Sequence, residues 1–185
     1  MANLKVLGIV GSLRRESFNR RLIEAAKELA PAGMSIEVCD IAAVPLYNED
    51  DYKQGFPAPV GDLRQRIKAA DAVLIATPEY NYSIPGVLKN AIDWASRPPE
   101  QPFADKPMAL MGAGPGVSGS ARAQYHLRQA FVFLDARILS RPELMVPAAT
   151  AKFDAAGKLT DEATRKQLAD LLTALAAWTR RLKPA

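Results

Sequence analysis

Apolar runs and helical repeats alternate along the whole chain. Five mostly apolar runs, typical of buried parallel strands, lie at about residues 3–10, 34–40, 71–77, 107–112 and 136–146. Apolar residues recur at helical spacing at about residues 18–30, 60–70, 86–96, 120–134 and 160–182. This alternation predicts five strand–helix units, and therefore an α/β fold in which helices cover both faces of a parallel sheet.

The first apolar run continues directly into a polar turn and a helix. The turn reads Gly11-Ser-Leu-Arg-Arg-Glu-Ser-Phe-Asn19. A helix N-terminus presents unpaired N–H groups and a partial positive charge, so this turn can bind a phosphate monoester. The alternative is a serine that only caps the helix, which would not explain Arg14 and Asn19. A Walker A loop is excluded because no Gly-Lys-Ser/Thr sequence follows. The predicted phosphate contacts are Ser12, Arg14, Ser17 and Asn19.

The third apolar run ends in a loop that is stiffened by proline. Pro78-Glu-Tyr-Asn-Tyr-Ser83 is followed by Ile84 and Pro85, and the fixed φ of both prolines favours a rigid loop in which Tyr80 and Tyr82 offer ring faces. The alternative is two tyrosines packed against the domain. In the flavodoxin-like strand order 2-1-3-4-5, which a phosphate loop after the first strand favours, ligands bind where strands 1 and 3 end. A phosphate site together with the ring faces of Tyr80 and Tyr82 at that point indicates a mononucleotide ligand such as FMN.

Three motifs together resemble the NAD(P)H-dependent FMN reductase family, in particular its chromate and quinone reductase branch. They are the turn at 11–19, the loop at 78–83, and Gly86-Val-Leu-Lys-Asn-Ala-Ile-Asp-Trp94. The resemblance spans nearly the whole chain and implies a flavodoxin-like flavoprotein that binds FMN and uses NADPH or NADH. One departure is Ser120, which follows Gly119 where the family pattern has a second glycine. Besides the four phosphate contacts, the resemblance implies cofactor contacts at Gly11, Pro78, Glu79, Tyr80, Asn81, Tyr82, Ser83, Gly114, Gly116 and Gly119.

A glycine-rich segment after the fourth apolar run allows another interpretation. Gly114-Pro-Gly-Val-Ser-Gly119 matches the spacing of a dinucleotide fingerprint. That fingerprint needs an acid at the end of the second strand of its unit, whereas Asp135 is predicted to end a helix, and the segment here follows the fourth strand. The resemblance implies instead that the segment lines the pyrimidine side of a flavin, where glycines permit close approach of N–H groups.

Composition and charge narrow the class of protein. The chain has 185 residues with no linker-like segment, which predicts a single flavodoxin-like FMN-binding domain over 1–185. The net charge of +4 is modest for a nucleic-acid binder, so we expect no nucleic-acid partner. The same positive charge conflicts with the acidic docking face that is usual in a flavodoxin-type electron carrier. No apolar run approaches the roughly 18 residues of a membrane span, and no signal peptide is recognised. The sequence predicts a cytoplasmic protein without a membrane partner.

Cysteine and histidine are nearly absent, which excludes several kinds of site. Cys39 and His126 are the only residues of their types, so an internal disulfide and a multi-histidine centre are excluded. We interpret the acidic run at 49–51 as a solvated loop and predict no metal site. Because a flavin carries its own chemistry, no dedicated catalytic residue is expected, and Arg122 is only a candidate for attracting anionic substrates.

The predicted function is that of an FMN-dependent NAD(P)H oxidoreductase whose acceptors are quinones, chromate or flavin. The alternatives are a flavodoxin-type electron carrier or flavin-binding regulatory module, and an FMN reductase that releases reduced flavin. Helices 86–96 and 120–134 carry apolar residues on more than one face, and the resemblance implies a homodimer or homotetramer packed through them. The long segment 41–60 either covers a neighbouring subunit or borders the active site.

Overall fold

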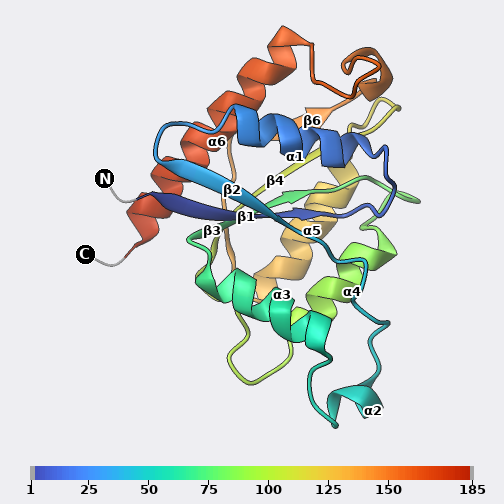
Figure 1. Ribbon diagram of the computed structural model, residues 1–185, viewed down its shortest axis with the longest axis vertical. Coiled ribbons are helices and arrows are strands. Elements are labelled where there is room, and N and C mark those ends of the chain that lie inside the picture. The colour runs from blue at the N-terminus through green and yellow to red at the C-terminus, as the bar shows by residue number, and fades with distance from the viewer. Residues whose placement is uncertain (1–2, 184–185) are drawn as a thin grey trace.

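The computed structural model describes residues 3–183 and has a central parallel sheet between two layers of helices (Figure 1). The sheet order is β2-β1-β3-β4-β5, and β6 also pairs with β4. This confirms the predicted flavodoxin-like order 2-1-3-4-5. The strands are β1 (Leu4–Val10), β2 (Met34–Cys39), β3 (Ala72–Ala76), β4 (Pro107–Ala113), β5 (Arg137–Ile138) and β6 (Leu144–Val146).

Helices cover both faces of the sheet, as the alternating pattern predicts. α1 (Phe18–Glu28) and α6 (Glu162–Leu182) pack on one face. α3 (Ala58–Ala69), α4 (Gly86–Ala95) and α5 (Ala121–Phe133) pack on the other. Two short helices, α2 (Glu49–Tyr52) and the 3-10 helix η1 (Ala149–Ala151), lie in connecting segments. Within residues 3–183, no helix has both the length and the apolarity needed to cross a membrane.

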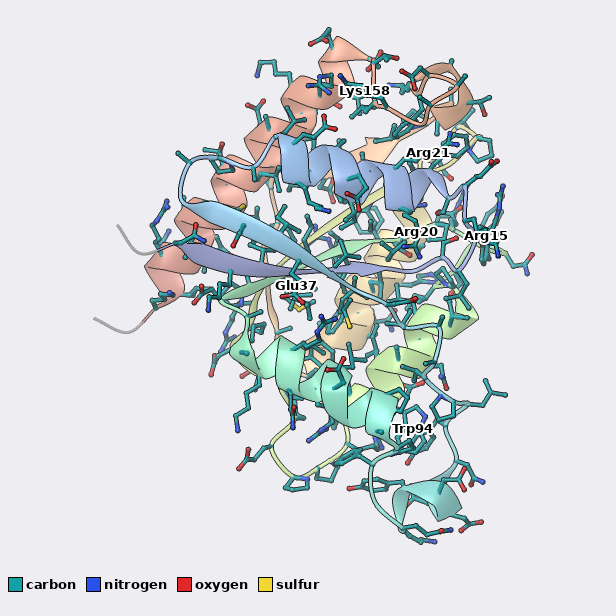
Figure 2. All side chains as sticks on the ribbon, viewed as in Figure 1. Arg15, Arg20, Arg21, Glu37, Trp94 and Lys158 are labelled. Carbon is teal, nitrogen blue, oxygen red and sulfur yellow. The ribbon has the colours of Figure 1, made fainter. Side chains whose placement is uncertain are left out.

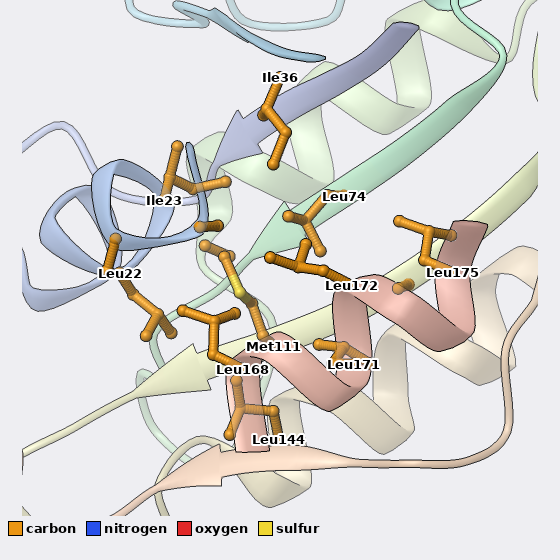
Figure 3. Packing of buried hydrophobic residues seen from close by; sticks show 14 of the residues in the cluster. Leu22, Ile23, Ile36, Leu74, Met111, Leu144, Leu168, Leu171, Leu172 and Leu175 are labelled. Atoms are coloured by element: carbon orange, nitrogen blue, oxygen red, sulfur yellow. The ribbon is translucent and has the colours of Figure 1, made fainter. Parts of the chain in front are cut away.

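The two faces of the sheet form two hydrophobic clusters. Along a strand, successive side chains point to opposite faces, so Val6 joins the cluster under α1 and α6 while Leu7 joins the cluster under α3, α4 and α5. Figure 3 shows Leu22 and Ile23 of α1 meeting Met111 of β4 and the leucines of α6. This packing fixes the carboxyl ends of the central strands, where the loops predicted to bind a ligand begin.

The prediction of one strand at 136–146 is wrong. β5 pairs with the start of β4, β6 pairs with its end, and residues 140–143 between them leave the sheet. Pro142 lies in this interruption and has no N–H to donate to a strand ladder, which accounts for the break.

The long segment 41–60 docks on α4 of its own chain. The carbonyl oxygen of Pro45 accepts hydrogen bonds from Asn90 Nδ2 (2.7 Å) and from Trp94 Nε1 (2.9 Å). The backbone N–H of Tyr47 donates to Asn90 Oδ1 (2.8 Å). Trp94 is fully buried. The motif at 86–94 therefore shapes α4 as a support for this segment.

Candidate functional site

Three loops meet at the carboxyl ends of β1, β3 and β4 and enclose a pocket of about 260 Å³. Predicted contacts that line it are Ser12, Arg14, Ser17, Asn19, Pro78, Glu79, Tyr80, Gly114 and Gly116. Predicted contacts outside its lining are Gly11, Asn81, Tyr82, Ser83 and Gly119. Lining residues that were not among the predicted contacts are Phe18, Ala113, Pro115, Ser118 and Ser120. Each of these is adjacent in the chain to a predicted loop or lies within one.

The first loop, residues 11–17, brings two buried hydroxyls to the start of α1. Ser17 Oγ accepts from the N–H of Asn19 (3.2 Å), so Ser17 caps the helix. Ser12 is also buried, and its Oγ accepts from the N–H of Arg14 (3.4 Å). Both hydroxyl hydrogens remain available to a ligand, so capping does not exclude phosphate binding. Arg14 is exposed, and Figure 2 shows its neighbour Arg15 at the same end of the molecule.

Asn19 connects the first loop to the end of β4. Its Nδ2 donates to the carbonyl oxygen of Ala113 (2.9 Å), and its Oδ1 accepts from the N–H of Ala113 (2.9 Å). The side chain is almost fully buried, with 2% of the residue exposed. Asn19 thus lines the pocket, but its amide is engaged with the backbone of the chain.

The second loop, residues 77–85, contains a tight turn. The backbones of Tyr80 and Ser83 exchange two hydrogen bonds, of 3.2 and 3.0 Å. The two central residues, Asn81 and Tyr82, have φ of 49° and 66°, as in a type I′ turn. Tyr80 lines the pocket, whereas Tyr82 stacks against the guanidinium of Arg122 at 3.8 Å from its ring centroid.

Glu79 ties the second loop to α5 and to the third loop. Its carboxylate accepts hydrogen bonds from the N–H groups of Arg122 (2.9 Å) and Ala123 (3.3 Å), from Arg122 Nη1 (2.7 Å) and from Ser118 Oγ (3.2 Å). Burial raises the pKa of Glu79, but the hydrogen bonds from Arg122, Ala123 and Ser118 outweigh burial and hold the pKa below its ordinary value. The side-chain hydrogen bond between Arg122 and Glu79 raises the pKa of Arg122. Arg122 therefore anchors the loop, and its charge is already paired.

His126 takes part in the same arrangement, which the sequence did not indicate. Its Nδ1 lies 2.9 Å from Ser83 Oγ, within hydrogen-bond distance. His126 follows Arg122 by one helical turn on α5, so both side chains contact the turn at 80–83 from one face of the helix. The spacing of these two residues on a predicted helix is the only signal that could have indicated this contact.

The third loop, residues 114–120, uses its glycines in two ways. A Cβ added at Gly114 or Gly116 would meet no atom within 4 Å, so the chain itself leaves this space open. The N–H of Gly114 donates to the carbonyl oxygen of Val146 (3.1 Å). Gly119 has φ of 52°, and an added Cβ would lie 2.7 Å from the backbone nitrogen of Val146. Gly119 is thus required by packing against β6.

Ser120 occupies a backbone conformation that favours glycine. Its φ is 76°, which agrees with the family pattern of a second glycine at this position. The residue is buried, and its Oγ accepts from Gln124 Nε2 (3.1 Å). At the start of α5, the hydroxyl of Ser120 thus occupies space that a glycine would leave open.

The donors and the open space suit a flat ligand that carries an anion. Ser12, Ser17 and Arg14 gather at the N-terminus of α1, which favours a phosphate group. Tyr80 and the glycines at 114 and 116 lie at the second and third loops, where the backbone leaves room for a ring. The residues present therefore fit an FMN molecule.

Comparisons with known proteins agree with this geometry. The family model described as NADPH-dependent FMN reductase matches residues 4–151. An NAD(P)H-dependent FMN reductase of Pseudomonas aeruginosa is 58% identical, with 98% of each chain covered. A quinone reductase of Escherichia coli is 46% identical, with 97% of each chain covered. The solved structure of a flavoenzyme NAD(P)H:(acceptor) oxidoreductase from Paracoccus denitrificans has a TM-score of 0.88 and 38% identity, covering 96% of this chain and 98% of that one.

Proposed function

The chain belongs to the NADPH-dependent FMN reductase family, and from that membership we propose how its three-loop pocket serves an FMN-dependent NAD(P)H oxidoreductase. The protein is such an enzyme rather than an electron carrier, and quinone reductases among its relatives support quinones as acceptors. We propose that residues 1–185 form one FMN-binding domain. The cytoplasmic location and the lack of a nucleic-acid partner stay predictions from the sequence.

The FMN phosphate binds at the first loop under this proposal. Ser12 and Ser17 would donate their hydroxyl hydrogens, and Arg14 would add a charge-assisted hydrogen bond from the rim of the pocket. The N–H groups at the start of α1 add a favourable dipole. The observation that carries the assignment is this set of buried hydroxyls beside a helix N-terminus, in the same pocket as the open glycines of the third loop.

The flavin ring would lie between the second and third loops. When bound, FMN accepts a hydride from reduced nicotinamide and passes the electrons to an acceptor. Pro78, Tyr80, Gly114 and Gly116 would orient the ring, while Glu79 holds their two loops together. Orientation of the reactants is the main contribution of the protein, so the proposal needs no dedicated acid or base.

Rapid mixing tests the oxidoreductase function directly. FMN-loaded protein mixed with NADPH or NADH should lose its oxidised flavin absorption faster than free FMN at the same concentration, because the pocket orients the nicotinamide. Steady-state quinone reduction should then show ping-pong kinetics, with parallel double-reciprocal lines. No acceleration over free FMN with either nucleotide would contradict the proposal.

We propose chromate and free flavin as further acceptors. The basic balance of the chain and the exposed Arg14 and Arg15 beside the pocket support attraction of anions. A second mixing step tests this, since the reduced protein should regain its oxidised absorption with chromate as it does with a quinone. Reoxidation by the quinone alone would remove chromate from the acceptors.

A homodimer or homotetramer is also part of the proposal. In α4, Leu88, Ile92 and Trp94 are buried, whereas α5 exposes Val132 (78%) and Phe133 (91%). We expect a mass above that of the monomer in light scattering at micromolar concentration, and Phe133→Asp should lower it. Val117→Asp, at an exposed position outside α5, is the matched control. A monomeric wild-type protein would contradict this part of the proposal.

A further inference from the structure

Resting on the proposed FMN site, we infer that Asn19 is a positioning residue that holds the third loop against the first, and not a ligand of the phosphate. Its carboxamide spans to Ala113 through two hydrogen bonds of 2.9 Å, one donated and one accepted. Asn19 is 2% exposed, so water does not compete for these bonds in the folded protein.

The two hydrogen bonds between Asn19 and Ala113 complete the edge of β4 beyond the point where β3 ends. The last paired residues of β3 and β4 are Ala76 and Met111, and the N–H of Thr77 still donates to the carbonyl oxygen of Met111 (2.9 Å). In a parallel ladder, residues two apart present their N–H and C=O groups to the same side. Ala113 therefore faces the side that β3 has left, and Asn19 satisfies its two backbone groups in place of a strand.

The first turn of α1 is linked by hydrogen bonds to both ends of the pocket. Ser17, a proposed phosphate contact, accepts a hydrogen bond from the N–H of Asn19 (3.2 Å). Ala113 directly precedes Gly114, where the open space for the ring begins. A change at Asn19 therefore moves the third loop relative to the phosphate site, although Asn19 is 94 residues away from Ala113 in the chain.

Two flavins that differ only in the phosphate separate a positioning role from a phosphate contact. We expect Asn19→Ala to weaken binding of FMN and of riboflavin by the same factor, about tenfold, as expected for loss of a buried hydrogen bond. Flavin fluorescence titration measures both affinities. Arg14→Ala is the matched comparison, because a phosphate contact affects FMN alone. Weaker FMN binding by Asn19→Ala with unchanged riboflavin binding would overturn the inference, as would no change in either.

Partial unfolding of the Asn19→Ala protein would also weaken the binding of both flavins equally. A separate control variant therefore tests for general destabilisation. Thr179→Val removes a buried hydrogen bond to Leu175 (2.7 Å) near the end of α6. This end of α6 lies across the molecule from the loop between β1 and α1 (Figure 1). This variant should lower the melting temperature and leave both flavin affinities unchanged. A fall in its flavin affinities equal to that of Asn19→Ala would overturn the inference, because general destabilisation would then explain the effect.

A second variant keeps the inference testable if Asn19→Ala does not fold. Asn19→Asp keeps an acceptor for the N–H of Ala113 but places a carboxylate oxygen against its carbonyl oxygen. Riboflavin carries no phosphate for the new charge to repel, so its weaker binding would support the positioning role and unchanged binding would overturn it. A wild-type protein that binds neither flavin would instead contradict the proposed FMN site.

Discussion

Arg14→Ala should weaken FMN binding by about one to two orders of magnitude while riboflavin binding stays the same. Arg14 lies on the rim of the pocket, beside the buried hydroxyls of Ser12 and Ser17. Losing a hydrogen bond to a charged group costs about 1.5–3 kcal/mol, and each 1.4 kcal/mol corresponds to about a tenfold change in affinity. The loss is confined to FMN because riboflavin lacks the phosphate.

Arg15→Ala is the control for this experiment. Arg15 is an exposed neighbour with the same charge (Figure 2). It does not line the pocket. We expect it to change FMN affinity only slightly, through a long-range charge effect that salt screens. An Arg14→Ala variant that binds FMN as tightly as the wild-type protein would show that the phosphate lies elsewhere.

The fold could be predicted because its central strands β3 and β4 are buried on both faces. All five residues of β3, Ala72–Ala76, are buried, so the strand reads as a continuous apolar run. The break between β5 and β6 was not predicted, because the apolar residues on either side of Ser140-Arg-Pro-Glu143 were interpreted as one run and Pro142 was not taken as the loss of a ladder donor. The short helix α2 was not predicted either, because its four residues, EDDY, carry no apolar stripe.

The location of the candidate site could be predicted, but the links between its loops could not. Loops after β1, β3 and β4 meet because parallel strands end at one edge of the sheet. The bonds from Asn19 to Ala113 and from Arg122 to Glu79 join residues 94 and 43 positions apart. Such pairs depend on side-chain direction at the strand ends, which one sequence without its fold does not specify. Glu79 lines the pocket and stays a predicted cofactor contact, whereas the bonds of its carboxylate to α5 were not predicted.

Gly112→Ala should destabilise the protein and abolish flavin binding at micromolar concentration. An added Cβ would lie 2.9 Å from Ser120 Cβ and overlap both Ser120 Oγ and the carbonyl oxygen of Thr77. Thr77 begins the second loop, and Ser120 ends the third, so relief of the overlap displaces two walls of the pocket. Overpacking a core typically costs about 1–3 kcal/mol, which corresponds to a fall in melting temperature of roughly 2–12 °C for a chain of this size.

Two further variants test whether the overlap of the added Cβ with Ser120 and Thr77 causes the loss of stability. Gly61→Ala adds a methyl group in open space on α3 and should raise stability by up to about 1 kcal/mol, because alanine favours a helix over glycine. Adding Ser120→Gly to Gly112→Ala removes the overlap with the hydroxyl but leaves the one with the backbone of Thr77, so stability should recover only in part. A Gly112→Ala protein with unchanged melting temperature and FMN affinity would mean that Thr77 and Ser120 can separate without cost, and that their close contact does not shape the pocket.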